Sequence, residues 1–202
     1  MVLSHKNILA NVAQISSILT PSLVPSLMGC LPIFHSFGFT VTLWWPLISG
    51  PKVISFPSPL EVGKIVEAIA QYRAALLVTT PTFLRSYLRK AKKEQLSSLN
   101  LVVTGAEKLP PPLREEFESK FDLPVCEGYG MTETTPVIGV NVPAKEGLRL
   151  GGQALKTWKN GSIGRPCPGI TIKVCRPGSQ EEIPANESGV LWSRDRMFFP
   201  AT

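Results

Sequence analysis

The stretch "LNLVVTGAEKLPPPLREEFESKFDLPVCEGYG" (Leu99–Gly130) decides the fold, because it alternates between two kinds of local pattern. An apolar run over 99–106 ends in Thr-Gly-Ala and predicts a buried strand. The segment 110–121 opens with prolines and then carries apolar side chains at helical spacing, which predicts a helix. The run over 123–130 predicts a second strand. Two strands joined by a helix form the repeating unit of a parallel sheet.

The same alternation continues toward the amino terminus, where Ser4 and Pro81 each mark the start of a helix. The motif from Ser58 to Glu61 also predicts a capping box at a helix start. The further predicted elements are a helix over 5–19, a strand over 26–32, an apolar core helix over 36–49, and strands over 52–56 and 75–80. The series predicts an α/β fold, with a parallel sheet flanked by helices.

The pattern changes near residue 137. A strand-like run over 136–143 is followed by a glycine-rich stretch and then by two runs with strand character. The predicted organisation is a partial α/β domain over 1–140, glycine-rich connecting loops over 141–161, and the start of a β-rich subdomain over 162–202 with an atypical carboxyl-terminal end.

The composition excludes several classes of protein. Apolar residues make up 44% and charged residues 18% of the 202 positions, which is typical of a folded chain. The net charge of +6 comes from scattered residues, so no nucleic-acid partner is expected. The four cysteines form no C-x-x-C pair, which argues against a zinc site. No signal peptide is visible, and a reducing compartment is therefore expected.

One long segment, 7–51, contains no Asp, Glu, Lys or Arg. A run of this length is compatible with a membrane span, but prolines and glycines interrupt it, so that no window of about 20 residues is apolar and unbroken. Buried core is the favoured interpretation, and contact with a membrane surface is the alternative.

Two consecutive predicted strands end in unusual loops, Thr104–Glu107 and Glu127–Glu133. In a parallel sheet, ligands bind beyond the carboxyl ends of the strands, so both loops would open onto one edge if the strands are neighbours. Tyr129 offers a flat face for a base and Thr132 a hydroxyl for a phosphate. Glu133 could lie beside phosphates if Mg²⁺ separated the like charges. A glycine-rich turn with local hydrogen bonds from its hydroxyls is the alternative.

His35, in "LPIFHSFGF", is the one histidine in a potential site. A lone histidine in an apolar segment is more often a hydrogen-bonded core residue, so both interpretations stay open. Neither a G-x-G-x-x-G nor a G-x-x-x-x-G-K-[ST] motif occurs, and "NGSIG" over 160–164 is one glycine short of a nucleophile elbow.

Five motifs together carry a family resemblance. "LPIFHSFGF", "TTPTFL", "TGAEKLPPPL", "EGYGMTETTP" and "GSIGRPCPG" occur in the order and spacing of the AMP-forming acyl-adenylate synthetases. The resemblance covers residues 2–193. The residues of the motifs are most similar to those of the acyl–acyl-carrier-protein synthetase branch. This branch includes the synthetase half of bacterial 2-acylglycerophosphoethanolamine acyltransferases.

The resemblance implies an ATP- and Mg²⁺-dependent enzyme that makes acyl-AMP from a fatty acid or another carboxylic acid. The acyl group would pass to the thiol of CoA, or of the phosphopantetheine arm of acyl carrier protein. A cytoplasmic location is implied, with peripheral contact at the inner membrane only through a missing or fused domain.

The resemblance also implies roles for individual residues. Adenine would lie between Tyr129 and the segment Gly105-Ala106-Glu107, with Gly128 and Gly130 admitting the nucleotide. The catalytic residues would be Thr132 at the α-phosphate, Glu133 on Mg²⁺, and His35 near the carboxylate. The acyl pocket would be lined by His35, Thr80, Phe83 and Gly130.

The family's phosphate loop would lie before Val2, and its ribose-binding aspartate, hinge and catalytic lysine would lie after the matched region. Ser193 to Thr202 departs from the family pattern. The chain is therefore expected to be an internal fragment of the large amino-terminal domain and inactive alone. A non-catalytic nucleotide- or acyl-binding module and a membrane-surface interaction protein are the alternatives.

Overall fold

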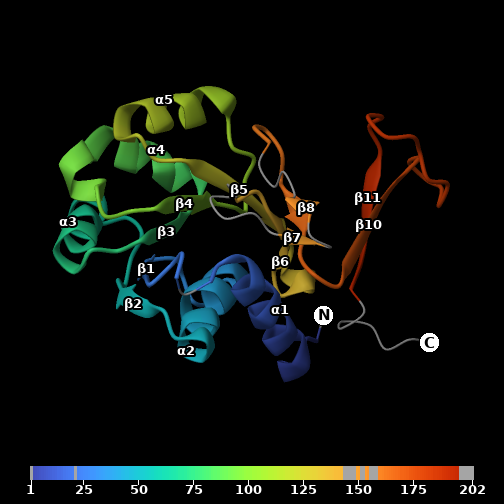
Figure 1. Ribbon diagram of the computed structural model, residues 1–202, viewed down its shortest axis with the longest axis horizontal. Helices are drawn as coiled ribbons and strands as arrows, with labels where there is room; N and C mark the ends of the chain where they lie inside the picture. Colours follow the sequence, from blue (N-terminus) through green and yellow to red (C-terminus); the bar gives the residue numbers. More distant parts are fainter. Residues whose placement is uncertain (1, 21, 143–148, 151–152, 155–158, 196–202) are drawn as a thin grey trace.

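A mixed sheet forms the centre of the protein (Figure 1). The computed structural model describes residues 2–20, 22–142, 149–150, 153–154 and 159–195. In spatial order, the strands of the sheet are β2 (Lys52–Ser55), β1 (Ser26–Gly29), β3 (Leu76–Thr79), β4 (Leu101–Thr104), β5 (Val125–Gly130), β6 (Val137–Val140) and β9 (Arg165–Pro166). The first five strands, β2, β1, β3, β4 and β5, are parallel to one another. Strand β6 runs antiparallel to β5, and β9 runs antiparallel to β6.

The expected parallel sheet is thus correct for five strands and needs a correction at one edge. The turn from Met131 to Pro136 joins β5 to β6 directly. A connection this short can only reverse the chain, because a parallel neighbour needs a crossover of a dozen or more residues.

The central strands are apolar at consecutive positions because both faces of the sheet are covered. Leu77 and Val102 pack into one hydrophobic cluster, while their neighbours in β3 and β4 pack into a second cluster on the opposite face. The neighbours are Leu76, Val78, Leu101 and Val103. This explains why the strands appear in the sequence as unbroken apolar runs.

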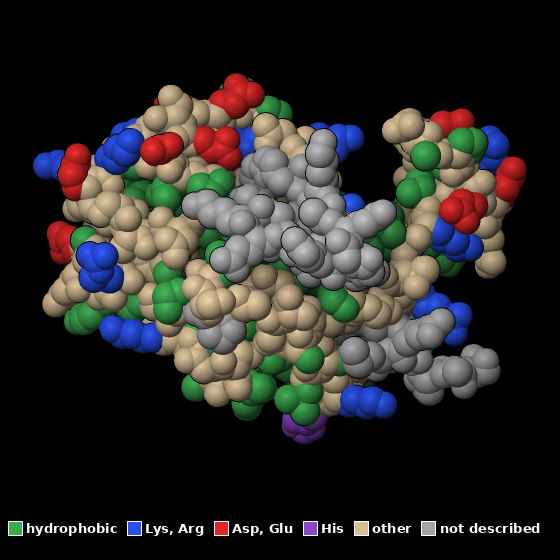
Figure 2. All heavy atoms as spheres, viewed as in Figure 1, with side chains coloured by type: hydrophobic (Ala, Val, Ile, Leu, Met, Phe, Trp, Pro, Cys, Tyr) green, Lys and Arg blue, Asp and Glu red, His purple; other side chains and the backbone are tan. Residues whose placement is uncertain are grey.

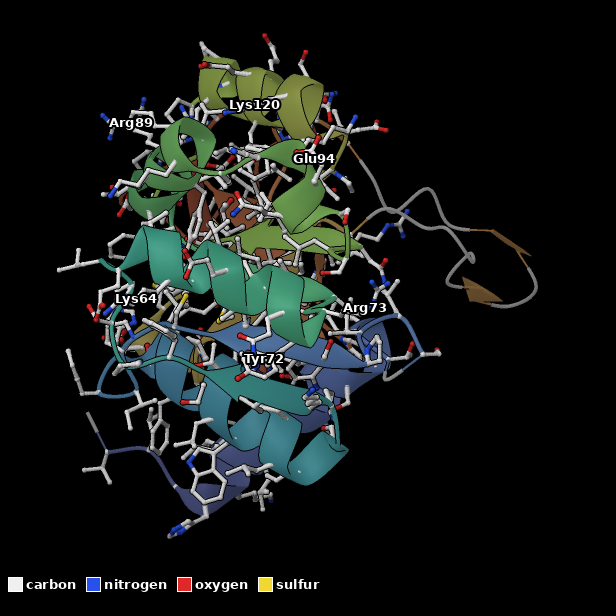
Figure 3. The ribbon with its side chains drawn as sticks, turned by 90° about the vertical axis from the view of Figure 1, so that its left-hand side faces the viewer. Lys64, Tyr72, Arg73, Arg89, Glu94 and Lys120 are labelled. Carbon is white, nitrogen blue, oxygen red and sulfur yellow. The ribbon has the colours of Figure 1, made fainter. Side chains whose placement is uncertain are left out.

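Three helices cover the first face: α3 (Val62–Tyr72), α4 (Pro81–Lys90) and α5 (Pro111–Phe121). The Nζ atom of Lys120 on α5 donates a hydrogen bond of 2.6 Å to the carbonyl oxygen of Leu88, which joins α5 to α4. Figure 3 shows Lys64 and Arg89 pointing away from the sheet, so the charged sides of these helices face solvent.

The second face is covered by α1 (His5–Ile18), the π-helix η1 (Gly38–Trp44) and α2 (Trp45–Ser49). Ser4 caps α1 as predicted. Its hydroxyl accepts a bond from the Asn7 backbone, and the Asn7 side chain accepts one from the Ser4 backbone. The 3₁₀ turns η2 (Lys93–Leu96) and η3 (Thr132–Thr134) complete the helical elements of the described residues.

The capping box predicted at Ser58 is wrong. The Ser58 hydroxyl accepts a local bond of 3.3 Å from the Leu60 backbone, and α3 begins later, after Glu61. The Glu61 side chain makes no capping bond and pairs instead with Lys64 one turn along. The motif therefore forms a turn ahead of the helix.

The composition of segment 36–49 had predicted a helix buried on all sides, but the structure shows burial on one side only. It divides into η1 and α2. Trp45 is completely buried, whereas the side chains of Trp44, Leu47 and Ile48 are exposed. Figure 2 shows few charged side chains on the lower part of the molecule, over α1 and α2, and many over α3 and α5. No helix of the described ranges has the length and apolarity that a bilayer span requires.

Strands β10 (Ile170–Cys175) and β11 (Val190–Asp195) form an antiparallel ribbon beside the main body (Figure 1). Strands β7 (Arg149–Leu150) and β8 (Gln153–Ala154) form another small pair. The predicted domain boundaries stay a prediction, because most of the connecting loops at 141–161 and the atypical end at 196–202 lie outside the described residues.

Candidate functional site

A cavity of about 240 Å³ opens at the carboxyl ends of β4 and β5 and extends between the sheet and the helices α1 and η1. Most of the predicted site residues line it. They are His35, Gly105, Ala106, Gly128, Tyr129, Gly130 and Thr132.

The two predicted loops meet because β4 and β5 are parallel neighbours, with Thr104 paired to Glu127. A glycine of each segment lines the cavity at this edge: Gly105 directly follows β4, and Gly128 lies within β5. A Cβ atom at Gly128 would meet its nearest protein atom at 3.7 Å, an ordinary contact. The backbone there is therefore open to close approach by a ligand.

The inner part of the cavity is aliphatic. Its wall comes from α1, η1 and strands β3, β4 and β6, and consists of Ile15, Leu19, Val41, Val78, Val103, Val137 and Val140. None of these side chains can donate or accept a hydrogen bond. A hydrocarbon chain has no polar groups whose hydrogen bonds to water would be lost, so it is the kind of ligand that fits such a space best.

The mouth of the cavity is polar. His35 is exposed there, so the alternative of a buried core histidine is wrong. The Nδ1 atom of His35 accepts a hydrogen bond of 3.2 Å from the backbone N–H of Phe37. An accepting Nδ1 places the proton of the neutral ring on Nε2, which is then a donor at the mouth.

Tyr129 and Ala106 both line the cavity. Tyr129 is half-buried and packs against the second hydrophobic cluster, which restrains its ring. Ala106 has a φ of 68°, in the left-handed region that alanine seldom adopts. Backbone strain of this kind costs about 1–3 kcal/mol and is found most often at ligand sites.

The hydroxyls of the "TETT" segment divide into two groups. Thr134 and Thr135 donate to backbone carbonyls, including those of Pro136 at 2.7 Å and Asn7 at 3.2 Å. They hold the turn in place, as the alternative interpretation from the sequence had it. The hydroxyl of Thr132 instead faces the cavity mouth and meets Ser36.

The glycine at 130 has a structural reason of its own. A Cβ atom there would lie 1.6 Å from the carbonyl oxygen of Pro136, so no larger residue fits this turn. Its presence in the motif therefore needs no ligand, although Gly130 also lines the cavity.

Glu107 lies beside the cavity rather than on its wall. Its carboxylate accepts a hydrogen bond of 2.7 Å from the hydroxyl of Thr82, in the first turn of α4. This bond ties the strained Ala106 turn to the neighbouring helix.

The two residues expected to complete the acyl pocket lie elsewhere. Thr80 caps α4, accepting a bond of 3.4 Å from the backbone of Phe83, and the ring of Phe83 packs against the first hydrophobic cluster. That cluster is on the opposite face of the sheet from the cavity. Neither residue lines the cavity, whose aliphatic wall comes from α1, η1 and the strands β3, β4 and β6 instead.

A nearly buried ion pair lies next to the loops that line the cavity. Arg114 of α5 lies 3.3 Å from Glu127 of β5, and the side chains are 8% and 13% exposed. Burial raises the pKa of Glu127, while Arg114 and then Lys108 act to lower it. The pair fixes α5 to the strand that carries Gly128 and Tyr129.

Glu133 is exposed at the turn η3. Across the described residues, no group of three or more His, Cys, Asp or Glu side chains comes together. A single carboxylate still fits Mg²⁺, which proteins often hold by one or two carboxylates together with substrate phosphates and water. Glu133 would then be the protein ligand and the nucleotide would supply the others.

Sequence reasoning missed some residues of the site. Ser36 was not distinguished from its neighbours, and Asn11 looked like any polar residue of an amphipathic helix. The Asn11 amide pairs with the backbone of Val137, donating at 2.7 Å and accepting at 3.1 Å, and so joins α1 to β6 at the cavity wall. A buried polar position on the helix face between Ile8 and Ile15 was the signal that could have identified it.

Comparison with known proteins bears on this geometry. A family model described as "AMP-binding enzyme" matches residues 1–200. The chain is 30% identical over 200 residues to the probable CoA ligase CCL5 of Humulus lupulus, covering 96% of this chain and 34% of the relative. It is 26% identical over 195 residues to a long-chain-fatty-acid–CoA ligase of Escherichia coli O6:H1, covering 94% and 33%.

Among solved structures, the fold is similar to that of apo MatB from Rhodopseudomonas palustris. The TM-score is 0.80 at 26% identity, and the match covers 98% of this chain and 37% of that one. The chain thus spans about a third of the length of the curated relatives it matches. The chain belongs to the AMP-binding enzyme family.

Proposed function

We propose that this chain supplies the nucleotide and acyl site of an enzyme that activates a carboxylic acid with ATP. The observation that carries the proposal is the lining of the cavity at the carboxyl ends of β4 and β5. One opening joins an aliphatic interior to a mouth lined by Tyr129, Ala106 and Thr132. A fatty acyl chain in the interior would place its carboxylate at the mouth, where the α-phosphate of a stacked nucleotide would lie.

The reaction has two steps. A carboxylate oxygen attacks the α-phosphorus of ATP, the bond to the bridging oxygen breaks, and acyl-AMP and pyrophosphate form. The sulfur of a thiol then attacks the acyl carbonyl carbon, AMP leaves, and the thiol proton passes to solvent. In-line attack of this kind is accelerated mainly by positioning and by stabilising the charge on the phosphate oxygens.

Each residue at the mouth has a part in this scheme. Tyr129 would stack on adenine opposite the turn at Ala106. The Thr132 hydroxyl would donate to an α-phosphate oxygen, and the Nε2–H of His35 would orient the carboxylate. Glu133 would hold Mg²⁺, which when bound neutralises phosphate charge.

The substrate would be a fatty acid, because the aliphatic wall has no group that could pair with a second carboxylate or a ring hydroxyl. The thiol would belong to CoA or to the phosphopantetheine arm of acyl carrier protein. Names of the relatives support CoA. The residues at 34–39, 105–109 and 127–143 resemble the acyl–acyl-carrier-protein synthetase branch and so support a carrier protein. Four free cysteines support a reducing compartment such as the cytoplasm.

A bisubstrate ligand tests the shared cavity. Calorimetry would compare AMP, a fatty acid, and a fatty-acyl sulfamoyl adenosine, which mimics acyl-AMP. We expect the joined ligand to bind about a hundredfold more tightly than AMP, because its chain fills the aliphatic interior. Equal affinities for AMP and the joined ligand would contradict the proposal. A pyrophosphate-exchange assay on the same chain would show whether binding is accompanied by adenylation.

A further inference from the structure

A hydrogen bond crosses the mouth of the cavity. The Oγ atom of Ser36 lies 3.1 Å from the Oγ1 atom of Thr132, and the two residues are 96 positions apart in the chain. Ser36 lies in the helical turn that leads directly into η1, and Thr132 begins the turn η3. Both residues line the cavity.

The two hydroxyls are placed to act together on a ligand. Thr132 is exposed and Ser36 is half-buried, so the bond lies at the surface of the mouth. The neighbouring hydroxyls of Thr134 and Thr135 are already engaged with backbone carbonyls of the turn. Within the described ranges, the Thr132 hydroxyl has Ser36 as its one hydrogen-bond partner in the protein.

Either hydroxyl can be the donor in this contact. A hydroxyl has one proton to donate and two lone pairs that accept. When Ser36 donates to Thr132, the threonine keeps its own proton for a third group, and rotation about its C–O bond is restricted. An oxygen of an anionic ligand is the acceptor that would gain most from that proton.

We propose that Ser36 is a positioning residue, which orients the Thr132 hydroxyl toward a phosphate oxygen of the nucleotide. The inference rests on the proposed function, since it assumes that the nucleotide occupies this mouth. It assigns to Ser36 a role that acts through Thr132 and leaves adenine binding to other residues.

A double-mutant cycle tests this role, with AMP and adenosine as probes. Ser36→Ala is expected to weaken AMP binding about three- to tenfold, the usual range for one hydrogen bond. Adenosine has no phosphate, so its affinity should change by less than about twofold. Thr132→Val should weaken AMP binding, and Ser36→Ala should add no further loss in the Thr132→Val background, because the group that it orients is absent.

Controls separate the possible failures. Ser97→Ala removes an exposed hydroxyl from the residue that follows η2 and should leave both affinities unchanged. Ser36→Thr keeps the hydroxyl and should retain AMP binding, and circular dichroism of each variant would confirm that it folds. If the two substitutions act additively on AMP, or if Ser36→Ala weakens adenosine equally, the positioning role is wrong. If wild type binds both probes and Ser36→Ala matches it, this inference alone fails. If wild type binds neither, the proposed function fails with it.

Discussion

Arg114 and Glu127 form a nearly buried ion pair of 3.3 Å between the helix α5 and the strand β5. Glu127 directly precedes Gly128, which lines the cavity, so the pair connects the packing of a helix to the shape of the candidate site. Burial raises the pKa of the carboxyl group, and the guanidinium opposes that rise.

Removal of the Arg114 guanidinium should therefore destabilise the folded protein. Arg114→Met leaves the carboxylate desolvated without its partner and should lower the free energy of unfolding by about 3–5 kcal/mol at neutral pH. Urea unfolding followed by circular dichroism would measure the change. The matched control is Arg176→Met, which breaks the exposed pair with Glu181 and should cost less than about 1 kcal/mol. Equal losses in both variants would contradict the structural role of the buried pair.

The same variant should show a changed pH dependence. A glutamate with a folded pKa above its ordinary value of 4.5 destabilises the protein as pH rises between the two values, because the folded state holds the proton longer. Arg114→Met raises the pKa further and widens that interval. The deficit relative to wild type should be smaller at about pH 4 than at about pH 7. A deficit that is constant across this range would contradict the assignment.

Stacking at the cavity wall can be tested at one residue. Tyr129→Ala should weaken adenosine binding about tenfold to a hundredfold, the usual range for loss of one aromatic stacking face. Calorimetry would measure the affinity. Tyr129→Phe keeps the ring and should bind adenosine nearly as wild type does. If alanine and phenylalanine have the same effect, stacking is not the role of this side chain.

The effect of Mg²⁺ on ATP binding should require the carboxylate of Glu133. ATP binding should be stronger with Mg²⁺ than without it, and Glu133→Gln should abolish that difference, because a neutral amide is a much poorer ligand for a hard cation. Titrations with and without the metal would measure the effect. Glu116→Gln, an exposed carboxylate of α5, is the control and should keep the dependence. Retention of the metal effect in Glu133→Gln would remove this residue from the proposed metal site.

The amide of Asn11 should contribute to stability. Asn11→Leu leaves the backbone N–H and carbonyl of Val137 without the partners they have now, in a buried place. We expect a loss of about 2–4 kcal/mol in the free energy of unfolding. Asn100→Leu, at an exposed amide, is the control and should be nearly neutral. A neutral Asn11→Leu variant would show that α1 does not depend on this contact.

All four cysteines should be inert in the folded protein. Cys30, Cys126, Cys167 and Cys175 are free and buried, and burial raises the thiol pKa of Cys30 and Cys126. A thiol reagent such as dithionitrobenzoate should react with none of them until denaturant is added, because the thiolate is the reactive form. Rapid reaction of one thiol in native buffer would show that the packing around it is wrong.

Much of this fold was predictable because its strands are apolar on both faces and are separated by helices. The neighbouring placement of β4 and β5, and with it the meeting of the loops at Gly105 and Gly128, followed from that alternation. The antiparallel direction of β6 was harder to predict, since the strand pattern alone does not give direction. The short turn after Gly130 determines that β6 runs antiparallel to β5.

The wall of the cavity was harder to predict for the same physical reason. When both faces of a strand are apolar, nothing in the sequence says which helix covers which face. Phe83 and Val41 are equally plausible neighbours of β3 from composition, yet the two lie on opposite faces of the sheet. Ser36 was missed because its hydroxyl acquires a role only through Thr132, far away in sequence.

The contact between Asn11 and Val137 also constrains the order of events during synthesis. The two residues are 126 positions apart, so the helix that forms one wall of the cavity emerges from the ribosome long before the strand that it must meet. Until then its inner side, with Ile15 and Leu19, has no permanent partner on that strand. While the intervening residues are synthesised, this apolar side of the helix lacks its partner on β6, and chaperone binding should concentrate on that interval.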